Sequence, residues 1–246
     1  MIFWSKIARI AALGLTLSGC ATIDYLHTPA GHFAGSVFVM WVGEGNGSGD
    51  GNFLFVPDPR DRLTFSRPNP QSHGAVIQPG IMYTDGGSIP KIAQVFNGFS
   101  PWGYAPGYMI HDWLFVGRHC LVDGEPGSRF DQIRDVGFDD SATILAEAIQ
   151  ALVASNQVKA NDVAGETISG AVDSFVAKNI WDETGACAGS AVSPKDRAAA
   201  EAAIPGSTTA LGRRNFDIEA FRLPPGTPRA APAAPAKIVA HVTFGH

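Results

Sequence analysis

Apolar positions in the first third of the chain follow the pattern of short β-strands. Residues 37–42 form a continuous apolar run, and residues 52–56 and 63–65 form two more. The proline-containing segment 57–59 separates the last two runs, as a turn does. From these runs we predict an antiparallel sheet over residues 33–84.

Glycine occupies every second position from Gly43 to Gly51, between the first two predicted strands. The polar residues that alternate with these glycines would suit a calcium-binding loop, but the bidentate glutamate that closes an EF-hand loop is missing. We therefore interpret the segment as the flexible tip of a hairpin, with a calcium loop as the alternative.

Beyond residue 100 the apolar positions take on helical spacing. Pro106 suits the first turn of a helix that we predict to run to about Val116 and to end at Gly117. We predict a second helix over residues 138–156 and a third over residues 162–181. The apolar face of the second helix consists of Ala142, Leu145, Ile149 and Leu152.

These elements predict an α+β fold, in which a small antiparallel β-sheet packs against a three-helix segment at residues 104–182. We place a single globular domain at residues 33–182. A helical or irregular extension follows at residues 183–222. Residues 223–246 are a Pro/Ala-rich tail, and within it residues 238–244 are a candidate edge strand.

The first twenty residues have the features of an export signal. Lys6 and Arg9 accompany a short apolar run at residues 10–17, which is shorter than the roughly 20 residues that cross a bilayer. The sequence Leu-Ser-Gly-Cys that ends at Cys20 resembles the lipobox of bacterial lipoproteins. This resemblance implies a signal peptide at residues 1–19 and a lipid on Cys20. The alternative is an ordinary secretory signal with a chance cysteine.

The residue after Cys20 bears on the destination of the protein. It is Ala21, and resemblance to enterobacterial lipoproteins implies transfer to the outer membrane, because Asp at this position is the usual retention signal. We expect a protein that faces the periplasm, with residues 20–32 as a tether and the membrane as its partner through the lipid.

Charge argues against a nucleic acid partner. Removal of residues 1–19 takes away two positive charges and no negative ones, so the formal net charge of −5 becomes −7. The remaining chain has no Lys/Arg cluster that could follow a phosphate backbone. In an oxidising envelope compartment, the remaining Cys120 and Cys187 favour one disulfide, with two free thiols as the alternative.

The first predicted helix carries two adjacent polar residues within an apolar segment, His111 and Asp112. Adjacent side chains project about 100° apart on a helix, so we expect each residue to have its own partner. Asp140 or Asp139 is the predicted partner of His111, since a carboxylate is what orients a catalytic base. Asp112 would then bind a cation, together with oxygens of the loop at residues 83–90.

The alternative is a purely structural network. In that interpretation a carboxylate satisfies His111, and Asp112 bonds loop amides to fix the helix in place. Asp139 then serves as the N-cap of the second helix rather than in catalysis.

Four segments together resemble the domain of unknown function 1353 family of phages and bacteria, over about residues 33–182. They are T-D-x-x-S-x-P, H-D-x-L-[YF], a helix that starts with Asp, and an A-V-x-x-F segment ending in Trp. The matching residues are Thr84, Asp85, Ser88, Pro90, His111, Asp112, Leu114, Phe115, Asp140, Ala171, Val172, Phe175 and Trp181. The family name implies no activity, and we expect a phage-like, non-catalytic binding or assembly module.

The His-Asp helix that follows a glycine loop also resembles secreted phospholipase A2. This resemblance implies that His111 activates water, that Asp112 binds calcium and that Asp140 orients His111; Asp85 in the glycine loop is a further candidate metal ligand. The cysteines that flank His-Asp in animal phospholipases are absent, and the calcium-loop pattern is not reproduced. The alternative function is thus a metal-dependent hydrolase with calcium as the candidate cofactor.

Overall fold

The computed structural model describes residues 24–43, 52–84, 103–125, 128–159, 175–208 and 233–245. The strands are β1 (His32–Gly43), β2 (Asn52–Pro57), β3 (Thr64–Ser66), β4 (Val76–Ile77), β5 (Met82–Thr84) and β6 (Lys237–Phe244). The α-helices are α1 (Ala105–Val122), α2 (Phe138–Ala154), α4 (Phe175–Trp181) and α5 (Pro194–Ala203). Three 3-10 helices complete the described elements: η1 (Tyr25–His27), η3 (Ser128–Ile133) and η4 (Ala188–Ser190).

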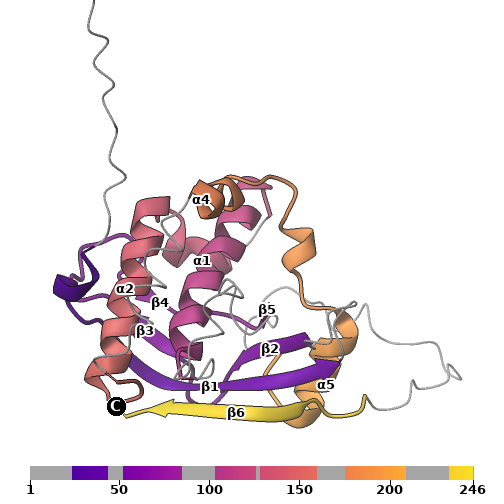
Figure 1. Cartoon of the computed structure of the whole chain (residues 1–246). Helices are drawn as coiled ribbons and strands as arrows, with labels where there is room; N and C mark the ends of the chain where they lie inside the picture. The colour runs from indigo at the N-terminus through magenta and orange to yellow at the C-terminus, as the bar shows by residue number, and fades with distance from the viewer. Residues whose placement is uncertain are drawn as a thin grey trace, which may run out of the picture.

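A curled antiparallel sheet lies under helices α1 and α2, with α5 beside its opposite face (Figure 1). The strand order is β4-β3-β1-β2-β5, and β6 also pairs with β1. Strands β2 and β6 both pair with residues 37–41 of β1, so β1 lies between them. The predicted α+β class is therefore confirmed.

Residues 37–42 of β1 form an unbroken apolar run, and both faces of this part of the strand pack against other elements. Successive side chains point to opposite faces of a sheet. Val37 and Val39 are fully buried in the core that contains α1 and α2, whereas Met40 is buried on the other side together with Ala200 of α5. A strand buried on both faces explains the uninterrupted apolar run.

The C-terminal strand β6 confirms the predicted edge strand. Its register on β1 runs from Gly35 opposite Phe244 to Trp41 opposite Lys237. Phe244 is buried and stacks on Phe33, with ring centroids 4.8 Å apart. Within the described part of the chain, the outer edge of β6 has no partner strand.

The prediction that Gly117 ends the first helix is wrong. Helix α1 continues to Val122, and Gly124 ends it with a positive φ of 75°. The amides of Gly124 and Glu125 bond back to the last turn, as in a Schellman motif. Gly117 serves packing instead, because a Cβ there would lie 2.1 Å from the end of the Ile133 side chain.

Helix α2 begins at the predicted residue, but with a different cap. Gly137 occupies the N-cap position, and the carboxylate that accepts its amide, at 3.5 Å, belongs to Asp140. Asp139 is exposed in the first turn and is not the N-cap. Of the predicted third helix, only its end is described, as α4; the remainder lies outside the described residues.

A buried ion pair joins the sheet to α2. Arg67, which follows β3, donates to Glu147 through Nε at 2.8 Å and through Nη2 at 3.1 Å. Its Nη1 donates to the His73 carbonyl at 2.8 Å and to Asp140 at 3.3 Å. Burial disfavours the charge of Arg67, but the two carboxylates outweigh this and raise its pKa.

The tether is shorter than predicted. Residues 25–27 form η1, and Gln150 of α2 donates to the Tyr25 carbonyl at 2.8 Å. The Gly31 amide donates to the Glu147 carbonyl at 3.1 Å. Residues 25–31 are thus fastened to α2, and the part of the predicted tether before Asp24 lies outside the described residues.

No helix in the described ranges is long and apolar enough to cross a membrane.

We predict that Arg67→Met destabilises the fold by about 3–5 kcal/mol, because it leaves Glu147 charged and unpaired in the core. Arg67→Met combined with Glu147→Leu should recover most of this loss, since apolar groups then replace both charges. Urea unfolding followed by circular dichroism measures both effects.

The control for this pair is Arg134→Met. Arg134 pairs with Asp131 on the surface, where the two side chains are 57% and 52% exposed, so its loss should cost less than about 1 kcal/mol. A double variant as unstable as Arg67→Met alone would contradict the role given to the buried pair.

Candidate ligand-binding face of helix α1

His111, Phe115 and Arg118 lie on one face of α1 because they are four and three residues apart. We call these three residues the α1 stripe; each side chain is partly exposed. His111 Nε2 and Arg118 Nε are buried atoms, and neither has a hydrogen-bond partner among the residues that the structure describes. An unsatisfied buried polar group costs about 1–3 kcal/mol, so the stripe carries polar groups that the described protein does not use.

His111 and Asp112 do approach each other, contrary to the prediction that each has a separate partner. The His111 Nδ1 atom lies 3.7 Å from the Asp112 carboxylate. Both side chains are largely buried, with 12% and 23% exposed. The Asp112 carboxylate therefore lies on the Nδ1 side of the ring, and Nε2 faces away from it.

The predicted partner of His111 is engaged elsewhere. Asp140 accepts hydrogen bonds from Arg67 at 3.3 Å and from the Gly137 amide at 3.5 Å, and His111 Nε2 donates none to it. Among the described residues, Asp140 therefore does not hold His111 Nε2. The buried Arg67 guanidinium is the stronger partner of Asp140, because it is always charged and its hydrogen bond is therefore charge-assisted. A hydrogen bond from histidine would be charge-assisted only with a protonated ring.

The proposed metal ligands are not brought together within the described structure. Asp85 and the glycine loop lie outside the described residues. In the ranges that are described, no three His, Cys, Asp or Glu residues form a group that could hold a metal ion. Among the described residues, the ion pair that Asp112 makes is its approach to His111. Cys20, the predicted lipid attachment site, also lies outside the described residues.

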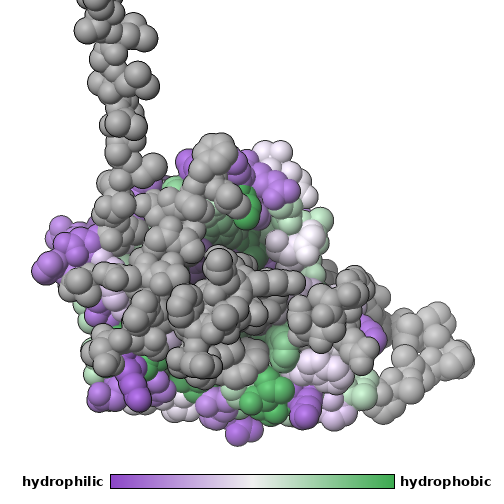
Figure 2. Space-filling model, in the orientation of Figure 1, coloured by the Kyte–Doolittle hydropathy of each residue, from purple (hydrophilic) through white to green (hydrophobic). Residues whose placement is uncertain are grey.

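Aromatic rings link the α1 stripe to α4. The His111 ring lies 4.9 Å from that of Phe115, and Phe115 makes an edge-on contact with Trp181 at 5.0 Å. Trp181 in turn contacts Phe138 at the start of α2, at 6.1 Å. Figure 2 shows a hollow with a hydrophobic floor beside α4, over the C-terminal half of α1 as drawn in Figure 1.

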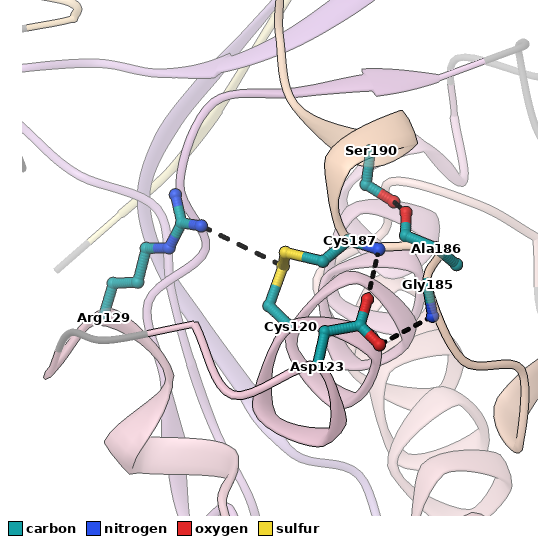
Figure 3. Close-up of a disulfide and its surroundings, with 7 residues drawn as sticks. All are labelled: Cys120, Asp123, Arg129, Gly185, Ala186, Cys187 and Ser190. Atoms are coloured by element: carbon teal, nitrogen blue, oxygen red, sulfur yellow. Dashed lines mark hydrogen bonds between the residues drawn. A yellow bond between two sulfur atoms is a disulfide. The ribbon is translucent and has the colours of Figure 1, made fainter.

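A disulfide joins the end of α1 to the segment after α4. It connects Cys120 to Cys187, 67 residues apart (Figure 3). The two cysteines thus form the disulfide that the sequence favoured and are not two free thiols. Closing a loop of this length stabilises the folded state by roughly 4 kcal/mol in the chain-entropy treatment. Arg129 Nη2 lies 3.9 Å from the Cys120 sulfur on the other side.

Asp123 reinforces this junction with two hydrogen bonds. Its carboxylate accepts from the Gly185 amide at 2.6 Å and from the Cys187 amide at 2.9 Å (Figure 3). These two bonds hold the pKa of Asp123 below its ordinary value, and the bond from the Cys187 amide has the larger effect. One turn earlier, the buried His119 ring bonds the Ile180 carbonyl at 2.6 Å. The last turns of α1 therefore fasten α4 and the segment that follows it.

Several residues of this region escaped the sequence analysis. The sequence does contain a sign of the role of Glu147, because this residue interrupts an apolar helix face. It lies seven residues after Asp140, so both carboxylates are on one side of α2. The sequence gives no such sign for Asp123 and Arg118, since each looks like an ordinary surface residue near a predicted helix end. Their roles depend on segments that are distant in the sequence.

Asp123 predicts a specific pH dependence. Its folded-state pKa lies below the ordinary value of 3.8, so the carboxylate stabilises the fold fully above that pH and loses this effect as the pH falls through the folded pKa. Asp123→Asn should therefore be less stable than the wild type at neutral pH, and the difference should shrink below pH 3.8.

Urea unfolding of the oxidised protein across this pH range measures the difference. Asp135→Asn, at an exposed position, serves as the control for loss of one surface carboxylate. A constant difference between Asp123→Asn and wild type at all pH values would contradict the role of the ionised carboxylate.

Comparisons with protein-family models, with curated proteins and with solved structures give no match to the chain.

Proposed function

We propose that this protein is a lipid-anchored lipoprotein of the bacterial envelope, at the periplasmic face of the outer membrane, whose α+β domain is a non-catalytic binding or assembly module. The lipobox-like sequence ending at Cys20 supports the anchor. The Cys120–Cys187 disulfide supports an exported protein, because disulfides persist in oxidising compartments and are rare in the cytosol.

The attachment of η1 to α2 gives the anchor a structural consequence. Tyr25, the first residue of η1, lies five positions after Cys20, and a stretch of this length spans at most roughly 18 Å when extended. The domain would therefore lie close to the membrane surface. The mature chain is acidic, so the lipid rather than charge attraction would hold it there.

The observation that carries the non-catalytic assignment is the engagement of Asp140 by Arg67, at 3.3 Å. A His-based hydrolase needs its imidazole held by a group that fixes the ring orientation. The carboxylate expected for that purpose instead belongs to the buried ion-pair network of the fold. The stripe keeps unused hydrogen-bonding atoms, which suits binding without requiring a reaction.

The anchor predicts the location of a simple variant. Cys20→Ser should move the protein from the membrane fraction to the soluble envelope fraction and abolish incorporation of a fatty-acid probe. Stable attachment requires more than one acyl chain, and this variant removes the site at which they would be added. Fractionation with immunoblotting measures the shift.

Ser18→Ala is the matched control, because it changes a neighbouring residue and leaves the cysteine in place. It should remain lipidated and in the membrane fraction. Membrane retention of Cys20→Ser would overturn the proposed anchor.

The alternative function, a hydrolase, has one observation in its favour. Asp112 lies 3.7 Å from His111 Nδ1, so it could take over the orienting role, and Nε2 is free to accept a proton from water. In that case His111→Ala should lower activity in a hydrolase screen at least about 100-fold with little change in melting temperature. His27→Ala, at an exposed position, is the control.

Loss of folding in His111→Ala would instead indicate a structural role for the ring. Metal analysis of the purified protein accompanies the screen, because the proposed hydrolase would need a cation such as calcium.

A further inference from the structure

We propose that the α1 stripe binds the anionic oxygens of a ligand, either a carboxylate or a phosphate, and that an apolar part of this ligand lies against Phe115. The inference rests on the binding function proposed above and adds the chemical class of the ligand. It does not depend on the lipid anchor.

Two nitrogen atoms point to an oxygen-bearing anion. Arg118 Nε can only donate, and it is buried without an acceptor in the described structure. His111 Nε2 is likewise buried without a partner and donates when it carries a proton. Carboxylates and phosphates are the groups whose geometry best matches a guanidinium, and their charge strengthens each bond.

The positions of these residues place both donors along one line. His111 and Arg118 are two helical turns apart, roughly 10 Å along the axis of α1. Long side chains on a helix lean toward its N-terminus, which for Arg118 is the direction of Phe115 and His111. A ligand that contacts both residues must therefore pass over Phe115.

Phe115 provides the apolar contact. Its ring is packed on one side by Trp181, at 5.0 Å, and the side chain remains partly exposed. The hollow beside α4 in Figure 2 has a hydrophobic floor. A ligand with only charge would leave this surface in contact with water, so an anion with an adjoining apolar group fits better.

The charges near His111 do not by themselves attract an anion to Nε2. Asp112 lies on the opposite side of the imidazole, 3.7 Å from Nδ1. The whole chain has a net charge of −5, so general attraction would not concentrate anions at its surface. Binding at the stripe would thus depend on the local donors, and removal of one donor should have a large effect.

The test is a titration of the full-length protein in detergent micelles, followed through the nitrogen NMR signals of the His111 ring. The probes are acetate, inorganic phosphate, phenylacetate and the neutral phenylacetamide. We expect saturable changes with the anions and none with phenylacetamide at the same concentrations. Phenylacetate should bind at least about tenfold more tightly than acetate, because its ring can cover Phe115.

Arg118→Gln should weaken anion binding at least about tenfold, since it removes the charge. Arg134→Gln removes an exposed arginine outside the stripe and should leave binding unchanged. Phe115→Leu should keep acetate binding and lose the preference for phenylacetate. Unchanged melting temperatures of the variants would show that these effects are not losses of folding.

Three results would overturn the inference: no saturable binding to wild type, equal binding of phenylacetamide, or unchanged affinity in a folded Arg118→Gln protein. Tighter binding of phosphate than acetate would assign a phosphate group, and the reverse order a carboxylate. Membrane attachment is measured separately, so absent anion binding in a protein that still fractionates with membranes would overturn this inference alone.

Discussion

The buried ion pair between Arg67 and Glu147 is the interaction on which the assembly of the domain depends. The Arg67 guanidinium binds a carboxylate of α2, the carbonyl of His73 and the Asp140 carboxylate at the start of α2. The Glu147 backbone carbonyl accepts the amide of Gly31. The N-terminal segment, the sheet and α2 thus meet at one place. A charge buried at such a junction is tolerated because nearly every donor of the guanidinium is used.

This network has a direct consequence for the candidate site. Because Asp140 belongs to it, His111 is left with Asp112 on one side and no partner on the other among the described residues. The carboxylate that the fold uses for stability is therefore not the one beside His111, which is Asp112.

The fold class could be predicted from the sequence because it depends on burial. The run at residues 37–42 is apolar since both faces of β1 are covered, and α2 shows its apolar face through helical spacing. The partners of single polar residues could not be predicted in this way. Asp140 suits a histidine partner and an arginine partner equally well in the sequence, and only the position of β3 beside α2 selects Arg67.

Two glycines show the same limit for helix ends. Gly117 and Gly124 both look like helix stops, since glycine commonly follows the last turn. Gly117 is retained within α1 because Ile133 and Phe130 occupy the space of its missing side chain. Gly124 ends the helix because it adopts a positive φ that the preceding residues do not. Local sequence offers both positions, and tertiary packing selects between them.

The polar residues along α1 provide an internal comparison for the stripe. Near its C-terminal end, the His119 ring hydrogen-bonds the Ile180 carbonyl of α4, and the Asp123 carboxylate accepts from two amides of the segment that the disulfide holds in place. Elsewhere on the same helix, His111 Nε2 and Arg118 Nε are buried and have no hydrogen-bond partner among the described residues. An external acceptor would complete the hydrogen bonds that the described protein leaves open at these two nitrogen atoms.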